Sequence, residues 1–207
     1  MGDVRLAQQL RHMGVADERV LHAIASLERR HFVPEAFARK AELDGPLPIG
    51  FGQTISQPYV VARMTELLEL VPGQRVLEVG TGSGYQAAVL AQMGLEVYSL
   101  EIVPELARRA RIRLEALGLS VHLREGNGYF GWAEEAPFDG VLLTAAPTEV
   151  PDLLVHALKV RGHLVAPVGE ANDTQELRRY TLRSAQGPID VETIFPVRFV
   201  PMTGGGY

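Results

Sequence analysis

The chain has 207 residues, of which 46% are hydrophobic and 22% charged, and this size and composition suit one globular domain with a substantial core. Its net charge of -5 argues against nucleic acid as a partner, and the absence of cysteine excludes disulfides, thiolate metal sites and a cysteine nucleophile. No apolar run is long enough to span a bilayer and residues 1–10 lack the apolar core of a secretory signal, so we expect a cytoplasmic protein without membrane contact or bound metal.

The N-terminal third is predicted to be helical. Apolar residues recur at helical spacing over 3–13 and 17–29, and Asp17 is a candidate N-cap for the second helix. A glycine-punctuated loop over 44–57 follows, with hydroxyl and amide side chains towards its end. A helix then runs from Pro58 to Leu70, because proline suits the first helical position.

From Val71 onwards, strands and helices alternate. The predicted strands are Arg75–Val79, Leu95–Leu100, Ser120–Arg124, Phe138–Leu143 and His163–Val168, and the predicted helices are Gly84–Met93, 104–117 and 151–159. This alternation predicts a doubly wound α/β fold with a parallel sheet covered by helices. Later segments are rich in β-forming residues and predict an antiparallel C-terminal edge: Glu176–Ser184, Ile189–Phe195 and Arg198–Val200.

These elements predict one structural unit. Residues 1–70 form an N-terminal helical cap with the polar loop, residues 71–203 form a Rossmann-like core, and residues 204–207 are a flexible glycine-rich tail. The segment Pro201-Met202-Thr203 is a candidate to reach a ligand bound by the core.

A glycine-rich segment joins the first predicted core strand to its helix. It has the sequence Glu78-Val79-Gly80-Thr81-Gly82-Ser83-Gly84. Glycines there permit a tight turn and close approach of a ligand to the backbone. The spacing is Gly-x-Gly-x-Gly rather than the dinucleotide pattern Gly-x-Gly-x-x-Gly, and the Glu78 carboxylate suits an ammonium group better than a pyrophosphate. The segment therefore favours S-adenosylmethionine over NAD, with Glu78 and residues 80–84 as cofactor contacts.

Two further strand ends carry candidate cofactor contacts. Glu101 ends the second predicted core strand, where a carboxylate can accept hydrogen bonds from ribose hydroxyls of either cofactor. Asn127 and Gly128 follow the third strand, where an amide can recognise the amino group of adenine.

The motifs together resemble those of the protein-L-isoaspartate (D-aspartate) O-methyltransferase family. The resemblance covers roughly residues 29–201, and its main segments are Arg30–Pro34, Asp44–Gly50, Gly52–Pro58, Val76–Ala87, Phe138-Asp139, Thr144–Pro147, Val165–Gly169 and Arg198–Pro201. The glycine-rich segment alone would indicate only class I S-adenosylmethionine-dependent methyltransferases, whereas Gly52–Pro58 makes the match specific to this family.

The resemblance implies a protein-repair activity. Members methylate the free α-carboxylate of L-isoaspartyl residues, and some D-aspartyl residues, in damaged proteins or peptides, and the methyl ester collapses to a succinimide. Ser56 matches the serine that is assigned as the active-site residue of the family. We expect Thr54 to assist it, and Ile55 and Thr144 to contribute to the acceptor site. We expect a monomer. This chain has Asn127-Gly128 where the family commonly carries Asp-Gly.

Other interpretations remain open at this stage. The chain can be a class I methyltransferase acting on nucleic acid, a small molecule or another protein carboxylate, an NAD-dependent oxidoreductase, or a non-catalytic binding module with the same fold. Ser56 can instead cap the following helix, although a proline at the first helical position would make Gln57 the cap. Thr144 can equally cap a turn.

Overall fold

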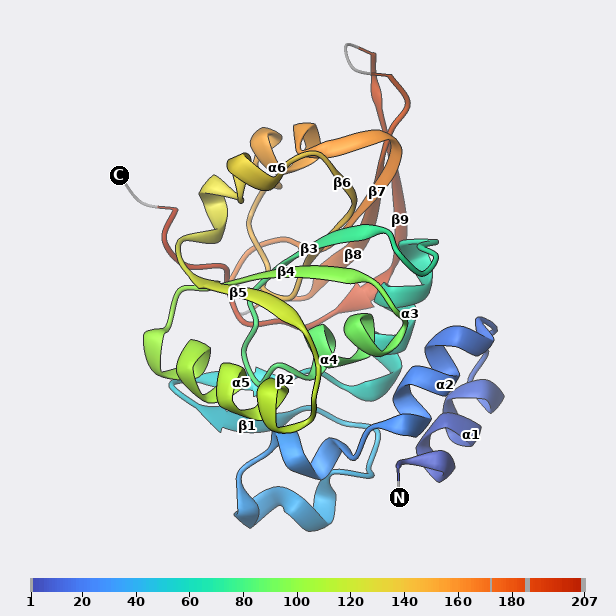
Figure 1. The fold of residues 1–207 in the computed structure, drawn as a ribbon. Helices are drawn as coiled ribbons and strands as arrows, with labels where there is room; N and C mark the ends of the chain where they lie inside the picture. The colour runs from blue at the N-terminus through green and yellow to red at the C-terminus, as the bar shows by residue number, and fades with distance from the viewer. Residues whose placement is uncertain (1, 172, 185–186, 206–207) are drawn as a thin grey trace.

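A mixed seven-stranded sheet forms the centre of the molecule (Figure 1). The computed structural model describes residues 2–171, 173–184 and 187–205. The strand order is β5-β4-β3-β6-β7-β8-β9. The strands are β3 (Arg75–Val79), β4 (Glu96–Glu101), β5 (Val121–Glu125), β6 (Phe138–Leu143), β7 (Leu158–Val168), β8 (Gln175–Leu182) and β9 (Ile189–Val197).

The pairing confirms a parallel core with an antiparallel edge. Strands β5, β4, β3, β6 and β7 pair in parallel, whereas β7–β8 and β8–β9 pair antiparallel. Alternate side chains of the central strands enter two apolar clusters on opposite faces: Val76 and Val97 join one, and Leu77 and Leu100 the other. Burial on both faces is what parallel strands require.

Helices cover both faces of the sheet. They are α1 (Val4–His12), α2 (Glu18–Ser26), α3 (Pro58–Leu67), α4 (Tyr85–Gln92), α5 (Pro104–Ala116) and α6 (Asp152–His156). Residues of the first five helices share one cluster, and Leu154 and Val155 of α6 belong to the other. The molecule is therefore doubly wound, as the alternation of elements predicted.

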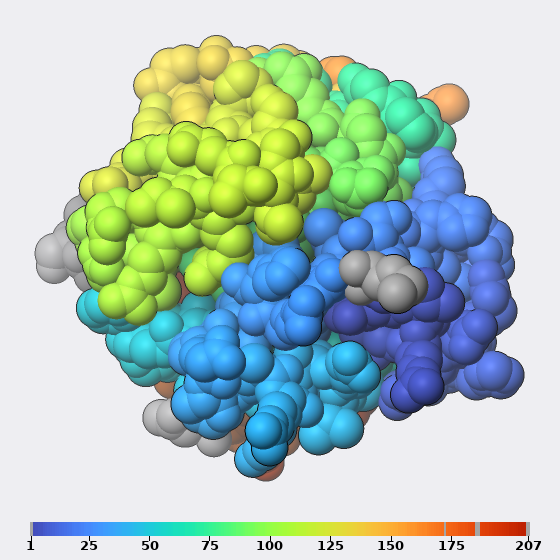
Figure 2. All heavy atoms as spheres, turned by 60° about the horizontal axis from the view of Figure 1, so that its bottom comes forward, coloured from blue at the N-terminus to red at the C-terminus, as the bar shows by residue number. Residues whose placement is uncertain are grey.

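The N-terminal segment is fastened to α3. The Asp17 side chain accepts a hydrogen bond from the Arg19 amide (2.9 Å), which confirms it as the N-cap of α2. Glu66 Oε1 on α3 accepts bonds from the amides of Ala16 and Asp17, both 2.7 Å long. Two 3₁₀ helices, Arg29–Phe32 and Glu35–Lys40, continue the segment. Figure 2 shows these blue N-terminal residues lying beside the yellow-green region that includes α5.

The polar loop is more regular than predicted. Residues 44–57 contain an antiparallel hairpin of β1 (Leu47–Gly50) and β2 (Gln53–Ile55). Its turn passes through three consecutive residues with positive φ, including Phe51 at 56°, and the flanking glycines adopt this conformation without a steric penalty. The short strands and their glycine and proline content hid the hairpin from the sequence pattern.

Two boundaries near the C-terminus were predicted wrongly. The predicted helix 151–159 ends at His156, and β7 begins at Leu158, well before the predicted His163. The predicted strand at Arg198–Val200 does not form. Instead, Val200 O accepts from the Ala146 amide and Ala146 O accepts from the Met202 amide, each at 2.8 Å. Pairing with the loop after β6 takes this segment away from the sheet edge and across the carboxyl ends of the strands.

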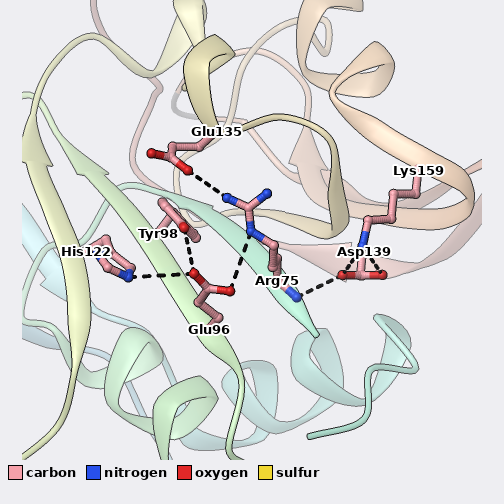
Figure 3. A network of polar contacts seen from close by, with 7 residues as sticks. All are labelled: Arg75, Glu96, Tyr98, His122, Glu135, Asp139 and Lys159. Carbon is pink, nitrogen blue, oxygen red and sulfur yellow. Dashed lines mark hydrogen bonds and ion pairs between the residues drawn. The ribbon is translucent and has the colours of Figure 1, made fainter. Parts of the chain in front are cut away.

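Charged side chains join the opposite, amino ends of the parallel strands (Figure 3). Arg75 on β3 binds Glu135 (2.7 Å) and lies 3.6 Å from Glu96 on β4. Asp139 on β6 accepts bonds from the Arg75 amide and from the Lys159 ammonium, both 2.9 Å long. These contacts connect the amino ends of β3, β4, β6 and β7.

Across the described ranges, no helix combines the length and apolar character needed to cross a membrane. Nor do the described residues contain a group of three or more His, Cys, Asp or Glu side chains placed to hold a metal ion.

Candidate active site

A cavity lies at the carboxyl ends of β3, β4 and β6, where the glycine-rich segment begins. Ten of the predicted site residues line it: Thr54, Ile55, Ser56, Gly80, Thr81, Gly82, Ser83, Glu101, Gly128 and Thr144. Residues that sequence reasoning did not select also line it, among them Gln53, Leu100, Ile102 and Val103. Ile102 and Val103 directly follow Glu101, so their position at a strand end was an available signal.

Thr144 braces the glycine-rich segment. Its hydroxyl donates to the carbonyl oxygens of Val79 (3.0 Å) and Gly80. Gly80 has φ of 100°, and a Cβ atom built on it would overlap the Thr144 hydroxyl. Glycine is therefore required here for both backbone conformation and space. Thr144 therefore lines the cavity and also stabilises the turn, through the hydrogen bonds of its hydroxyl to the backbone.

Glu101 presents a carboxylate to the cavity. The residue is 5% exposed, and its two oxygens accept backbone N–H bonds from Gly82 (2.7 Å) and Val103 (2.9 Å). Each carboxylate oxygen has a second lone pair and can accept a further bond from a ligand hydroxyl. Leu100 and Ile102 provide apolar walls beside it.

Glu78 does not line the cavity, contrary to the expectation that it contacts an ammonium group. It is fully buried, and its Oε2 accepts a hydrogen bond from Ser99, whose hydroxyl also lies 2.6 Å from that of Thr81. Burial raises the pKa of Glu78 to about 8, and the nearby Glu101 carboxylate adds to the effect. Glu78 is one residue before the end of β3, and its side chain lies on the face that also carries the buried Val76, outside the lining of the cavity. Gly84, which caps α4, also lies outside the lining.

Asn127 lies behind the cavity wall and holds the C-terminal segment. Its Oδ1 accepts from the Tyr129 amide (3.0 Å) and its Nδ2 donates to Gly204 O (2.8 Å). The cavity is lined on this side by Val200 to Thr203, as expected for the candidate segment around Met202. Gly204 is thus bonded rather than part of a free tail; residues 206–207 of that predicted tail lie outside the described residues.

Two hydroxyls remain available at the other side of the cavity. Within the part of the chain that the structure describes, the side chains of Thr54 and Ser56 have no hydrogen-bond partner in the protein. Gln57, not Ser56, is the N-cap of α3, so the capping interpretation of Ser56 is wrong. Each hydroxyl can donate a hydrogen bond to a bound polar group or accept one from it.

A groove continues outward from these hydroxyls. Thr54, Ser56, Thr144 and Val200 line both the cavity and this groove. The groove's own walls are largely apolar and aromatic: Pro46, Tyr59, Val60, Phe195, Pro196, Val197 and Phe199, with Arg198 at an exposed position. Sequence reasoning missed these aromatic residues because they come from two segments far apart in the chain.

The charge of the cavity selects between the candidate cofactors. Among the described residues that line it there is one carboxylate, Glu101, and no lysine, arginine or histidine. A diphosphate in such a site would lack a cationic partner, whereas a cationic ligand gains from the carboxylate. With the glycine turn, the acidic strand end and the apolar walls, the sheet and its cavity define a Rossmann-like class I methyltransferase.

Comparison with known proteins identifies the family. The model of the family described as protein-L-isoaspartate(D-aspartate) O-methyltransferase matches residues 2–206, and the chain belongs to this family. A protein-L-isoaspartate O-methyltransferase of Anaeromyxobacter dehalogenans (strain 2CP-1) is 58% identical over 200 residues, which cover 96% of this chain and 95% of that protein. The enzyme of that name from Myxococcus xanthus is 54% identical over 207 residues, covering 99% and 97%.

Solved structures agree with this assignment. One protein-L-isoaspartate O-methyltransferase superposes with a TM-score of 0.89 at 27% identity; the match covers 98% of this chain and 66% of that longer one. A crystal structure described as a protein-L-isoaspartate O-methyltransferase of Plasmodium falciparum, in complex with S-adenosyl-L-homocysteine, gives a TM-score of 0.80 at 26% identity and covers 98% and 99%.

Proposed function

We propose that this chain transfers a methyl group from S-adenosylmethionine to the free α-carboxylate of L-isoaspartyl residues, and of some D-aspartyl residues, in damaged proteins. The observation that carries the proposal is the pair of free hydroxyls, Thr54 and Ser56, where the cavity meets the aromatic groove. The uncharged junction supports a methyl donor in the cavity on one side and a peptide in the groove on the other.

The residues of the cavity fit the donor. We expect Glu101 to accept bonds from ribose hydroxyls and the backbone of residues 80–83 to hold the methionine end. Leu100, Ile102 and Met202, which line the same cavity, would enclose the adenine ring. When bound, the cofactor supplies an electrophilic methyl group on a sulfonium. Glu78 is linked to the cavity through hydrogen bonds, because it binds the Ser99 hydroxyl, which in turn contacts the hydroxyl of Thr81.

The acceptor needs orientation more than activation. A peptide carboxylate has a pKa near 3.5, so it is ionised at neutral pH and is itself the nucleophile. The Ser56 hydroxyl, with Thr54 beside it, can donate to one carboxylate oxygen and leave the other directed at the methyl group. Holding the reacting atoms in line is the main contribution open to these residues.

The test is methyl transfer from labelled S-adenosylmethionine to an isoaspartyl peptide and to its aspartyl twin. We expect label in the isoaspartyl peptide alone, as a base-labile ester. Equal labelling of both peptides would indicate a less specific carboxyl methyltransferase, and no transfer to either would overturn the proposal.

The proposal includes a monomer that acts in the cytoplasm without nucleic acid or membrane. Light scattering coupled to size exclusion tests this; a dimer at assay concentration would contradict it. Cell fractionation tests the location.

A further inference from the structure

Arg29 is a fully buried cation held by backbone carbonyls. It is 0% exposed, and within the described residues its guanidinium makes no ion pair. Nη1 donates to the carbonyl oxygens of Ala41 (2.8 Å) and Leu43 (3.4 Å), and Nη2 to those of Gly45 (2.8 Å) and Ser56 (3.0 Å). The planar fork of arginine is what allows one side chain to reach all of them.

These carbonyls belong to both ends of the segment that carries the hairpin. Ala41 to Gly45 precede β1, and Ser56 follows β2. One guanidinium therefore fixes where the segment leaves the N-terminal cap and where it returns to α3. Hydrogen bonds from a charged donor are strong, and a buried carbonyl left without a donor destabilises the folded state.

Asp44 fixes the backbone directly after Ser56. Its carboxylate accepts bonds from the Gln57 side chain (2.7 Å) and from the Tyr59 amide (2.8 Å). Ser56 itself is bonded through its carbonyl to Arg29, so the backbone is fixed at Ser56 and at the residues after it. The Ser56 hydroxyl, by contrast, is left free.

We propose that Arg29 is a positioning residue for the acceptor, which fixes the Ser56 backbone from behind the loop that receives the substrate carboxylate. This inference rests on the proposed function. The position of this backbone matters because, among the described residues that line both the cavity and the groove, Thr54 and Ser56 carry the hydroxyls that remain free to hold a carboxylate.

The first test replaces Arg29 by lysine, which keeps the charge but offers a compact ammonium that cannot span the carbonyls. In Arg29→Lys we expect kcat/KM for an isoaspartyl peptide to fall by about 10- to 100-fold, the size of effect that displacement of a reacting group produces. The KM for S-adenosylmethionine and the calorimetric affinity for S-adenosylhomocysteine stay at wild-type values. General loss of structure would change all three. The matched control is Arg30→Lys, since Arg30 is the exposed neighbour that pairs with Glu28.

A double-mutant cycle separates positioning from packing. If Arg29 acts by placing the Ser56 hydroxyl, Arg29→Lys costs less than about threefold when introduced into Ser56→Ala, because the group being placed is already gone. Full additivity of the two losses would overturn the proposal.

A third measurement is independent of catalysis. Hydrogen exchange of the amides in residues 44–58 should be faster in Arg29→Lys than in wild type, with exchange in β3 to β6 unchanged. If the wild-type enzyme methylates no isoaspartyl peptide, the proposed function fails and this readout alone decides on Arg29: unchanged exchange overturns it. If Arg29→Lys does not fold, Asp44→Ala provides a second test, because the half-exposed Asp44 holds the backbone after Ser56 through Gln57 and Tyr59. Wild-type kcat/KM for the peptide in Asp44→Ala would count against the proposal.

Discussion

At the scale of single residues, the acceptor hydroxyl is the sharpest prediction. Ser56→Ala removes a free hydroxyl without disturbing the cap of α3, which is Gln57. We expect kcat/KM for an isoaspartyl peptide to fall by about 10- to 100-fold, since one hydrogen bond to a charged group is worth roughly 1.5–3 kcal/mol. Affinity for S-adenosylhomocysteine, measured by calorimetry, should not change. Ser26→Ala, at an exposed serine of α2, is the control; undiminished turnover in Ser56→Ala would remove Ser56 from the mechanism.

The buried carboxyl of Glu78 gives a prediction about pH. Burial raises its folded pKa to about 8 from 4.5, so the folded state retains a proton that the unfolded chain loses. The free energy of unfolding therefore falls as pH rises between these values, at up to about 1.4 kcal/mol per pH unit. Glu78→Gln keeps the shape and lacks this loss.

Thermal unfolding from pH 5 to pH 9 checks this sign. The melting temperature of wild type should fall relative to Glu78→Gln as pH rises and then level off above the folded pKa of about 8. The expected scale is about 2–4 °C per kcal/mol for a chain of this size. Glu125→Gln, at an exposed glutamate, should follow wild type. A constant difference between wild type and Glu78→Gln at all pH values would contradict the prediction.

At the scale of elements, the turn from β3 into α4 depends on one glycine. Gly80→Ala would put a Cβ against the Thr144 hydroxyl in a backbone conformation with φ of 100°. Strain of about 1–3 kcal/mol predicts a loss of roughly 5- to 150-fold in affinity for S-adenosylhomocysteine. Relief by a second change, Thr144→Ala, would identify the overlap as the cause. Wild-type affinity in Gly80→Ala would show that the turn has room to adjust.

At the scale of the whole molecule, the last part of the chain closes the cofactor cavity. Val200 to Thr203 line it, yet none of them belongs to a strand of the sheet. A chain that stops after Val200 should therefore fold and bind S-adenosylhomocysteine at least about 10-fold more weakly, because the Met202 side chain no longer covers the site. Circular dichroism and calorimetry measure the two properties; full affinity in the shortened chain would exclude the segment from the site.

The features that could be predicted from the sequence are those that depend on residues close together in the chain. The glycine-rich turn and Glu101 were found because each sits at the end of a short buried strand, and parallel strands bring such ends together. Local chemistry also predicted the Asp17 cap and the position of Pro58.

Contacts between distant segments were not predictable in this way. Arg29 reaches Ser56 only through the fold, and the Val200 carbonyl bonds to Ala146 instead of extending a strand. Glu78 was predicted to contact the cofactor because the sequence shows that it lies next to the glycine-rich turn. The direction of its side chain depends on which face of β3 it occupies, and that face is buried.

The Asn127-Gly128 pair has a consequence for the lifetime of the enzyme itself. Asparagine followed by glycine is the dipeptide most prone to deamidation, which requires the glycine nitrogen to attack the side-chain amide. Here both ends of that amide are bonded, to Tyr129 and Gly204, and the buried Gly128 lies so close to Val79 that a Cβ atom built on it would overlap that side chain. These bonds oppose the side-chain movement that the attack requires, so we expect Asn127 to deamidate more slowly in folded than in unfolded molecules.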